Sequence, residues 1–299
     1  MSPAPFYAYT PEDVTAAFDD ISPILFDGKT VESIPRLLIT AGLQSSGKTY
    51  LLENSLLPSG RYSNHVRLYL PQYREKHPQY AEMIKLGVLH AYKHTEAFVR
   101  AVSGKVFEAA LAGKFNIIME CAFDDIAFAE LATFAAGYQL EAYVVGCNQA
   151  FAHLSSIKRA LKNLDEKKLE RFVSYSALQT SMNNAPQILL AMETLAKSVN
   201  GSRIVLFERG FGTLNERVVR AHSTYNQDAN GKLTISATET PYTYSAYEAV
   251  INNQLSMSER DEIVKVCHLE LLAIEPHALQ VPDFVYSDLY AYIVKFAYR

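Results

Sequence analysis

The stretch Gly42-Leu43-Gln44-Ser45-Ser46-Gly47-Lys48-Thr49 matches in full the pattern G-x-x-x-x-G-K-[ST], which is typical of phosphate-binding loops. Its two glycines let the backbone curl so that successive N–H groups point inward, and the start of the following helix completes a concave anion site. In such a loop Lys48 reaches the β- and γ-phosphates of a nucleotide, and the Thr49 hydroxyl binds magnesium. The stretch therefore predicts a nucleotide site.

The segments on both sides of this loop have the order that such a site requires. Residues 36–40 are an apolar run typical of a short buried strand, and residues 49–54 favour a helix. This strand, loop and helix order makes a chance match improbable. The predicted nucleotide-binding residues are Gly42, Gln44, Ser45, Ser46, Gly47, Lys48 and Thr49, and the predicted metal ligand is Thr49.

The composition bounds the class of protein and its partners. The chain has 299 residues, of which 49% are hydrophobic, so it can bury one large core. Its formal net charge of -4 gives no basic field for a nucleic-acid backbone or an anionic membrane. We therefore expect a small ligand, with no nucleic-acid or membrane partner.

The chain also shows the features of a cytoplasmic protein. No segment is apolar over a length that would span a bilayer, and the first residues lack the basic and apolar regions of a signal peptide. Cys121, Cys147 and Cys267 lack the C-x-x-C spacing of zinc or redox sites, and an odd number of cysteines argues against a disulfide framework. These observations predict cytoplasmic localisation.

Five short apolar runs alternate with helical patterns, and this alternation predicts the fold. The runs are residues 37–40, 66–70, 116–119, 142–146 and 204–207. Strands buried on both faces have this appearance, and alternation with helices implies a parallel sheet. We predict an α/β protein with the fold of a P-loop kinase, in which helices flank a mostly parallel, five-stranded central sheet.

Helix signals are clear in four places, three of them after the first predicted strand and one before it. Residues 79–111 are long enough for two helices broken near Gly87 or Gly104, and Asn148 is a good N-cap for a helix to residue 164. Further helices are expected over residues 186–198 and from Thr10 to Phe18.

The pattern changes after residue 210. A turn at residues 226–231 separates two strand-like runs, and helices are expected at 245–254 and 258–272 before a Tyr-rich end. Because we find no linker and no repeat, we predict one domain over residues 1–299, in which residues 210–299 are a C-terminal elaboration.

A second group of polar residues follows the second predicted strand, in the order Tyr73-Arg74-Glu75-Lys76-His77-Pro78-Gln79-Tyr80. Ligands of open α/β sheets lie beyond the carboxyl ends of the strands, so this segment is expected to face the phosphate loop. The pattern Tyr-Arg-x-x-His-Pro-x-Tyr in this place, together with the loop, resembles the zeta toxins, the kinase halves of bacterial epsilon/zeta toxin–antitoxin systems.

Further segments add to this resemblance, which runs from about Tyr9 to Glu262. The strand at residues 116–120 is similar to the family's strand that ends in a substrate-side glutamate, here Glu120. Arg159, with Arg171 twelve residues on, resembles the pair of arginines that clamps phosphate in the family.

The resemblance implies an activity and its partners. It implies a kinase that uses ATP and Mg²⁺ to phosphorylate a sugar hydroxyl of UDP-N-acetylglucosamine or a related UDP-sugar, which inhibits cell-wall synthesis. It also implies a small helical antitoxin that holds the kinase inactive.

The residues themselves allow the same chemistry. Phosphoryl transfer needs charge neutralisation around the migrating group, so Lys48, Arg159 and Arg171 form a credible clamp. Arg74 and His77, with Glu120, are then expected to bind the acceptor substrate.

One departure from the family pattern affects the general base. The zeta toxins carry an aspartate two residues before the aromatic residue of the Tyr-Arg-x-x-His-Pro element, and Pro71 stands there in this chain. Glu120, Asp124 and Asp125 are candidate substitutes, because strand ends converge on the site. Asp125 is equally suited to cap a short helix, and Glu120 could instead hold magnesium through water.

Pro71 also leaves two alternative functions open. The chain could be a kinase of the same fold that acts on another nucleotide or a dinucleotide cofactor. It could also be a catalytically weakened nucleotide-binding module that acts through its partners.

Overall fold

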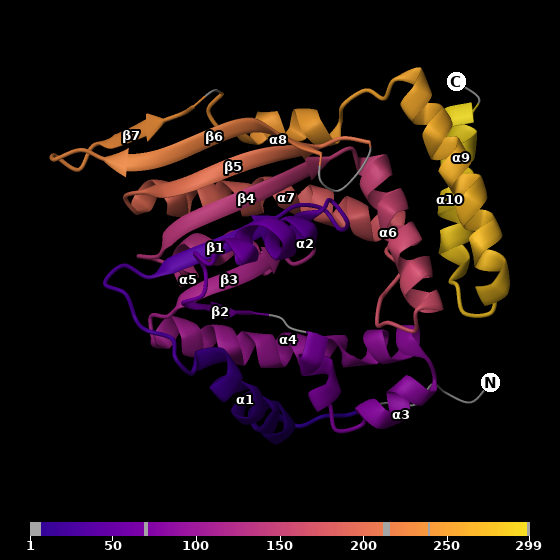
Figure 1. The fold of residues 1–299 in the computed structure, drawn as a ribbon, viewed down its shortest axis with the longest axis horizontal. Helices are drawn as coiled ribbons and strands as arrows, with labels where there is room; N and C mark the ends of the chain where they lie inside the picture. Colours follow the sequence, from indigo (N-terminus) through magenta and orange to yellow (C-terminus); the bar gives the residue numbers. More distant parts are fainter. Residues whose placement is uncertain (1–6, 69–70, 212–215, 239, 298–299) are drawn as a thin grey trace.

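The structure, a computed structural model, describes residues 7–68, 71–211, 216–238 and 240–297. The described chain forms one seven-stranded sheet with the order β2-β3-β1-β4-β5-β6-β7 (Figure 1). Strands β1 to β5 pair in parallel, and β6 and β7 are antiparallel to their neighbours. The strands are β1 (Arg36–Ala41), β2 (His65–Arg67), β3 (Asn116–Cys121), β4 (Gln139–Cys147), β5 (Ser202–Arg209), β6 (Arg217–Gln227) and β7 (Leu233–Ser236).

The predicted α/β class with a mostly parallel sheet is confirmed, but the sheet has seven strands where five were expected. The five predicted runs correspond to β1 to β5, except that residues 69–70 of the second run lie outside the described residues. The two strand-like runs around the turn at residues 226–231 are the additional strands, β6 and β7. They carry no continuous apolar run because β7 is the exposed edge strand and β6 is buried only at alternating positions near its end.

Strand β1 occupies the middle of the parallel part of the sheet, between β3 and β4. Leu37, Leu38 and Ile39 of this strand are fully buried because helices cover both faces. A parallel sheet that is buried on both faces favours such continuous apolar strands. The phosphate-binding loop therefore starts from a strand that is buried along most of its length.

Ten α-helices surround the sheet in the described residues, and Figure 1 shows α7 behind β4 and β5, and α1 with α4 beyond β2. No helix in the described ranges has the length and apolar character needed to cross a membrane. The helices are α1 (Pro11–Phe26), α2 (Lys48–Leu51), α3 (Tyr80–Lys85), α4 (Val88–Ala112), α5 (Leu131–Phe134), α6 (Gln149–Asp165), α7 (Tyr175–Ser198), α8 (Tyr244–Ile251), α9 (Met257–Ile274) and α10 (Asp283–Ala297).

Most predicted helix signals coincide with observed boundaries. Gly87, with φ 110°, separates α3 from α4, whereas Gly104 lies inside α4. Asn148 caps α6 as expected, accepting hydrogen bonds from two backbone N–H groups of the first turn. Two helices are longer than predicted, since α1 continues to Phe26 and α7 begins after Ser174. In both helices a buried apolar stripe continues past an internal proline. Burial of this stripe outweighs the destabilisation that the proline causes.

The last two helices form an antiparallel pair that packs on α6 outside the sheet (Figure 1). The fully buried His153 of α6 joins them: its Nδ1 lies 2.9 Å from the Tyr292 hydroxyl of α10, and its Nε2 donates to the Val173 carbonyl at 2.8 Å. Asp288 of α10 accepts a hydrogen bond from the Tyr175 N–H. The Tyr-rich end of the chain thus fixes α6 and the segment before α7.

Protonation of His153 should weaken this packing. Burial lowers the pKa of His153 below its ordinary value, although Val173 and Asp288 oppose the shift. As the pH falls below about 6.5, the unfolded chain takes up this proton before the folded chain does, so stability is lost with falling pH. We expect the melting temperature to drop by roughly 5 °C between pH 7 and pH 5.

Differential scanning fluorimetry of H153Q and of the exposed control H268Q tests this expectation. H153Q should have a lower melting temperature than the wild type at pH 7, and its melting temperature should fall less on acidification. H268Q should behave as the wild type does. Identical pH profiles of H153Q and the wild type would rule out His153 as a source of the pH dependence. His65 contributes in the same direction, because burial lowers its pKa to about 4, so H153Q should flatten the profile only in part.

Candidate active site

The phosphate loop follows β1 directly, and its first glycine packs against two neighbouring strands. The Gly42 N–H donates to the Cys121 carbonyl of β3 at 3.0 Å. A Cβ atom on Gly42 would lie 2.4 Å from the Val145 carbonyl oxygen of β4, with φ at 150°. Only glycine fits there, because real Cβ contacts are not so short.

The rest of the loop has the backbone conformation of an anion cradle. Gly47 has φ 101° and Ser45 has φ 60°, so both lie in the left-handed region. The buried Ser45 and Ser46 hydroxyls have no hydrogen-bond partner within the described residues, which suits a phosphate ligand. The Gln44 side chain is bonded to Ser181 of α7. Gln44 therefore offers only its backbone to a ligand.

Lys48 is a buried cation at the start of α2. Its side chain is only 9% exposed, and Nζ lies 3.4 Å from the Leu43 carbonyl oxygen. Burial lowers the pKa of Lys48, the carboxylates of Glu120 and Asp124 oppose this shift, and Arg159 adds to it. The predicted carboxylates and one predicted arginine are thus within electrostatic reach of Lys48.

Thr49 and Glu120 form the pair that suits a magnesium ion. The Thr49 hydroxyl donates to Glu120 Oε2 at 2.6 Å. Their proximity follows from the sheet, since Thr40 of β1 and Glu120 of β3 are register partners. Magnesium prefers oxygen ligands and is usually held by one or two protein groups together with substrate phosphates and water. The hydroxyl and the carboxylate oxygen of this pair suit that mode of binding.

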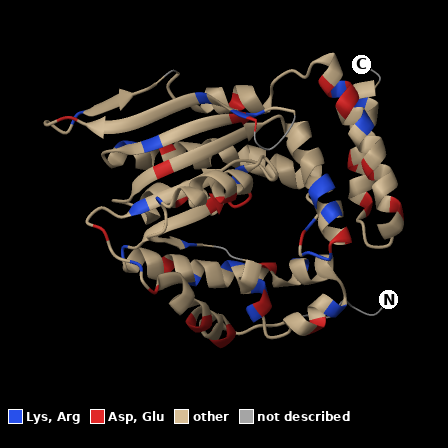
Figure 2. Ribbon diagram, in the orientation of Figure 1, with Lys and Arg blue, Asp and Glu red and all other residues tan. Residues whose placement is uncertain are grey.

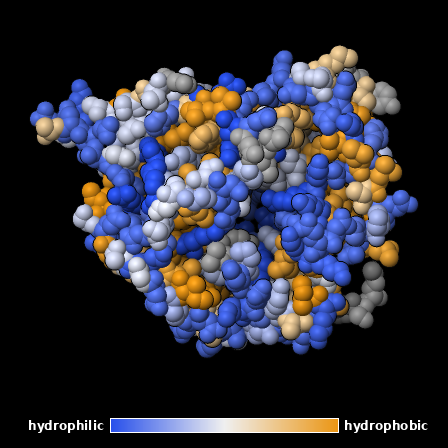
Figure 3. All heavy atoms as spheres, viewed as in Figure 1, coloured by the Kyte–Doolittle hydropathy of each residue, from blue (hydrophilic) through white to orange (hydrophobic). Residues whose placement is uncertain are grey.

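The two predicted clamp arginines come from α6 and from the segment that follows it, which we call the opposite wall of the cleft between α2 and α6 (Figure 3). Arg159 of α6 forms an ion pair with Glu170 at 2.7 Å. Arg171, in the segment between α6 and α7, lies 3.3 Å from Asp124 and 3.6 Å from Glu96 of α4. Figure 2 shows basic residues on the lower half of α6, and Figure 3 shows a hollow lined by hydrophilic residues between α2 and α6. Charged groups thus gather where the loop opens.

Arg74 and His77 occupy the buried interior next to this cleft. Arg74 is 2% exposed, and its guanidinium group donates to the Tyr92 carbonyl, the Thr95 hydroxyl and Glu96, all on α4. His77 is also 2% exposed and packs edge-on against Phe98. Burial lowers the pKa of His77, so its ring is neutral at pH 7. Direct contact of these two side chains with a substrate stays a prediction.

Sequence patterns did not identify Glu96, which links these groups. Its carboxylate contacts Arg74 at 2.6 Å, Arg100 at 3.4 Å and Arg171 at 3.6 Å. The only local signal is the i, i+4 spacing to Arg100, which usually marks an exposed helix pair. The contacts to Arg74 and Arg171 join distant segments and leave no spacing pattern.

The carboxylates after β3 divide into two roles. Asp125 caps the short helix Ile126–Glu130, where its Oδ1 accepts the Ala127 N–H at 3.0 Å. Asp124 pairs with Arg171 and lies near Lys48. Asn184 of α7 donates to the preceding Phe123 carbonyl and holds this turn in place. Asp124 is therefore the carboxylate of this turn that contacts a predicted site residue.

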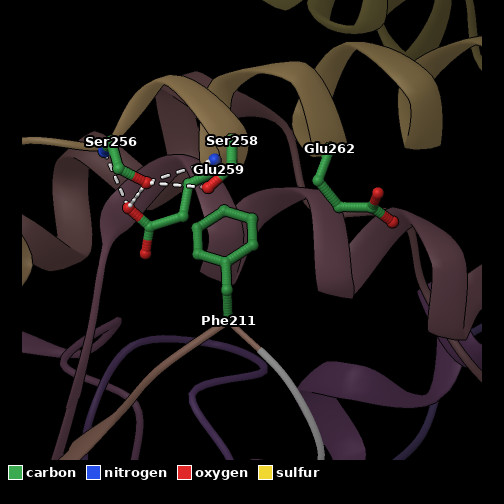
Figure 4. Close-up of a pocket in the computed structure, with 5 residues that line it drawn as sticks. All are labelled: Phe211, Ser256, Ser258, Glu259 and Glu262. Atoms are coloured by element: carbon green, nitrogen blue, oxygen red, sulfur yellow. Dashed lines mark hydrogen bonds between the residues drawn. The ribbon is translucent and has the colours of Figure 1, made fainter.

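A separate surface pocket of about 420 Å³ lies at the start of α9 (Figure 4). Glu259 and Glu262 line it beside the Phe211 ring, and the Glu259 carboxylate is bonded to Ser256 of the helix cap. None of the predicted site residues lines this pocket. Two carboxylates disfavour a phosphate ligand, so we place no nucleotide there.

Comparisons with solved structures agree with this fold. A structure from the PezAT chromosomal toxin–antitoxin system of Streptococcus pneumoniae has a TM-score of 0.60 and 14% identity, and covers 91% of this chain and 98% of that chain. The AvrRxo1-ORF1:-ORF2 structure with ATP has a TM-score of 0.48 and 12% identity over 94% of this chain and 86% of that chain. The first of these likenesses shows the P-loop kinase fold. Comparison with curated protein sequences found no match.

The sequence comparison with protein families gives a match. The model of the family described as zeta toxin covers residues 25–226, which is more than half of the chain. The matched range includes the phosphate loop, Glu120 and both predicted clamp arginines. This chain therefore belongs to the zeta toxin family.

Proposed function

We propose that this protein is a kinase that transfers the γ-phosphoryl group of ATP to a sugar hydroxyl of UDP-N-acetylglucosamine or a related UDP-sugar. This reaction removes a cell-wall precursor and inhibits cell-wall synthesis. The observation that carries the proposal is the arrangement of a buried Lys48, the Thr49–Glu120 pair and the arginines of the opposite wall around one phosphate loop. Membership in the zeta toxin family supports the same reaction.

The chemistry of the transfer is mostly positioning and charge neutralisation. The loop amides and Lys48 bind the phosphate chain of ATP. Magnesium, bound at Thr49 and Glu120, would neutralise charge on the phosphate oxygens. Arg159 and Arg171 approach the same phosphates from the opposite wall and stabilise the charge that spreads over the migrating group.

Both arginines are already in ion pairs, and these pairs can be exchanged for substrate. The Arg159 and Arg171 side chains are 45% and 33% exposed. Ion pairs that remain in contact with water contribute little to stability, so a more strongly charged phosphate can replace the carboxylates. The pairs with Glu170 and Asp124 therefore hold the arginines near the cleft until substrate binds.

Asp124 is our candidate for the general base. Pro71 has no ionisable group, and the Glu120 carboxylate is engaged by Thr49 at the predicted metal position. Asp124 lies on the acceptor side, next to Arg171, and is within electrostatic reach of Lys48. Arg74 reaches this side through Glu96, so we propose that it and His77 shape the acceptor pocket.

Two further proposals follow from the comparisons and the substrates. The structure with a TM-score of 0.60 comes from a toxin–antitoxin system, and this supports a small antitoxin partner. ATP and UDP-sugars occur in the cytoplasm, so we propose that the protein acts there. The substitution at Pro71 supports a different nucleotide or dinucleotide acceptor as a second candidate.

The kinase activity is testable with purified protein. We expect incubation with ATP, Mg²⁺ and a panel of UDP-sugars and dinucleotides to add one phosphoryl group to a UDP-sugar, measured by mass spectrometry. K48M should abolish product because it removes the buried cation, and K197M, which removes an exposed ion pair with Glu193 on α7, should not. Product on a dinucleotide alone would favour the second candidate. ATP binding without any product would contradict the kinase proposal.

Substitution of each carboxylate identifies the base. D124N should lower kcat by about 10²-fold with little change in ATP affinity, the size expected for a lost acid–base group. E120Q should instead raise the Mg²⁺ concentration needed for half-maximal rate. D125N is the matched control and should affect stability more than turnover, because Asp125 caps a helix. Wild-type turnover of D124N would show that Asp124 is not the base.

A further inference from the structure

Two arginines outside the predicted site contact the phosphate loop. Arg209, the last residue of β5, donates from its guanidinium group to the Ser45 carbonyl oxygen at 2.7 Å. Arg217, the first residue of β6, donates to the Gly47 carbonyl oxygen at 3.5 Å. The two are register partners across the antiparallel β5–β6 pair. Two like charges therefore lie side by side next to the loop.

These arginines approach from a different direction than Arg171. Strand β5 lies on the β4 side of β1, whereas Arg171 pairs with Asp124, which follows β3 on the other side of β1. The strand order thus separates Arg209 and Arg217 from Arg171.

The surroundings of the pair are short of negative charge. Arg209 is 7% exposed, and its Nε has no hydrogen-bond partner within the described residues. The structure records aromatic contacts instead: Arg209 lies 4.7 Å from the centre of the Phe151 ring, and Arg217 lies 5.4 Å from that of Tyr50. Burial lowers the pKa of both arginines, and the charge of Arg209 lowers the pKa of Arg217 further, whereas Cys147 and Tyr50 oppose these shifts.

Other arginines on the same strands differ from this pair. Arg203 of β5 forms an ion pair with Glu141, and Arg220 of β6 forms one with Glu208. No carboxylate ion pair is recorded for Arg209 or Arg217 in the part of the chain that the structure describes. A buried cation without an anion is costly, so the fold keeps an uncompensated positive field at this place.

The hydrogen bonds also act on the loop backbone. In a trans peptide the C=O and N–H groups point in opposite directions, so a carbonyl held from outside turns the next N–H the other way. Gly47 O is held by Arg217 and by the Leu51 N–H at 3.0 Å, and this fixes the Lys48 N–H. Arg209 holds the carbonyl of Ser45, whose φ of 60° is unfavourable for a residue other than glycine.

We propose that Arg209 and Arg217 are a second cationic pair of the nucleotide site, which positions the phosphate loop and raises its affinity for a polyphosphate chain. The inference rests on the proposed function only in taking a nucleoside triphosphate as the ligand of the loop. The pair lies outside the group of residues that face the acceptor. It therefore acts on ATP binding and leaves recognition of the acceptor unchanged.

The test compares R209M and R217M with R220M, in which an exposed arginine on β6 is replaced in the same way. Isothermal titration calorimetry should show that R209M and R217M bind ATP more weakly, with a dissociation constant about tenfold to hundredfold larger than that of the wild type. Inorganic tripolyphosphate should lose affinity by a similar factor, because the arginines act on the phosphate chain. R220M should bind both ligands as the wild type does.

Steady-state kinetics and a conservative variant separate this role from a structural one. In both methionine variants KM for ATP should rise while KM for the acceptor stays unchanged, and R217K should recover part of the ATP affinity because it keeps the charge. Arg217 is less buried than Arg209, so R217M keeps the test valid if R209M does not fold. Wild-type affinity for ATP in R217M and in folded R209M would overturn this inference alone, whereas a wild-type protein that does not bind ATP would overturn the proposed function.

Discussion

The close approach of Gly42 to β4 is the constraint on which the site depends. The phosphate loop can leave β1 in this direction only because no side chain stands between Gly42 and the Val145 carbonyl. This path brings Gly47 and Lys48 over the carboxyl ends of β1 and β3, where Glu120 meets Thr49. The sheet thus determines the geometry of the loop, and the loop determines where phosphate and metal can bind.

Charge is arranged around the loop in a connected network. Arg74 binds Glu96, Glu96 contacts Arg171, and Arg171 contacts Asp124 at the end of the β3 turn. Each member is at least partly shielded from water, so the ion pairs fix the positions of the arginines better than free surface side chains could. A bound phosphate would take the place of a carboxylate in this network, which links acceptor-side residues to the transfer site.

The part of the fold with strong local signals could be predicted from the sequence. The glycine and lysine spacing of residues 42–49, the five buried runs and the Asn148 cap each depend on neighbouring residues alone. The sequence showed β6 and β7 only as strand-like runs, and it did not show the start of α7 before Pro186, because packing against the rest of the molecule decides these elements.

The site was predictable to a similar extent. Lys48, Thr49 and Glu120 come together because each stands at a strand end or in the loop, and strand ends of a parallel sheet meet at one edge. Glu96 and Arg209 could not be assigned in this way. Glu96 meets Arg171 across 75 positions of the chain, and Arg209 meets Ser45 across 164. Contacts between residues so far apart in the sequence depend on the folded arrangement and leave no periodic pattern in the sequence.

The central claim is that the loop holds a nucleoside triphosphate between Lys48, the Thr49–Glu120 pair and the arginines of the opposite wall. A crystal structure with a non-hydrolysable ATP analogue and Mg²⁺ tests it most directly. The account predicts the β- and γ-phosphates at the amides around Gly47, the metal at the Thr49 hydroxyl, and Arg159 or Arg171 turned toward the γ-phosphate. A triphosphate bound elsewhere, with the loop amides facing only water, would contradict it.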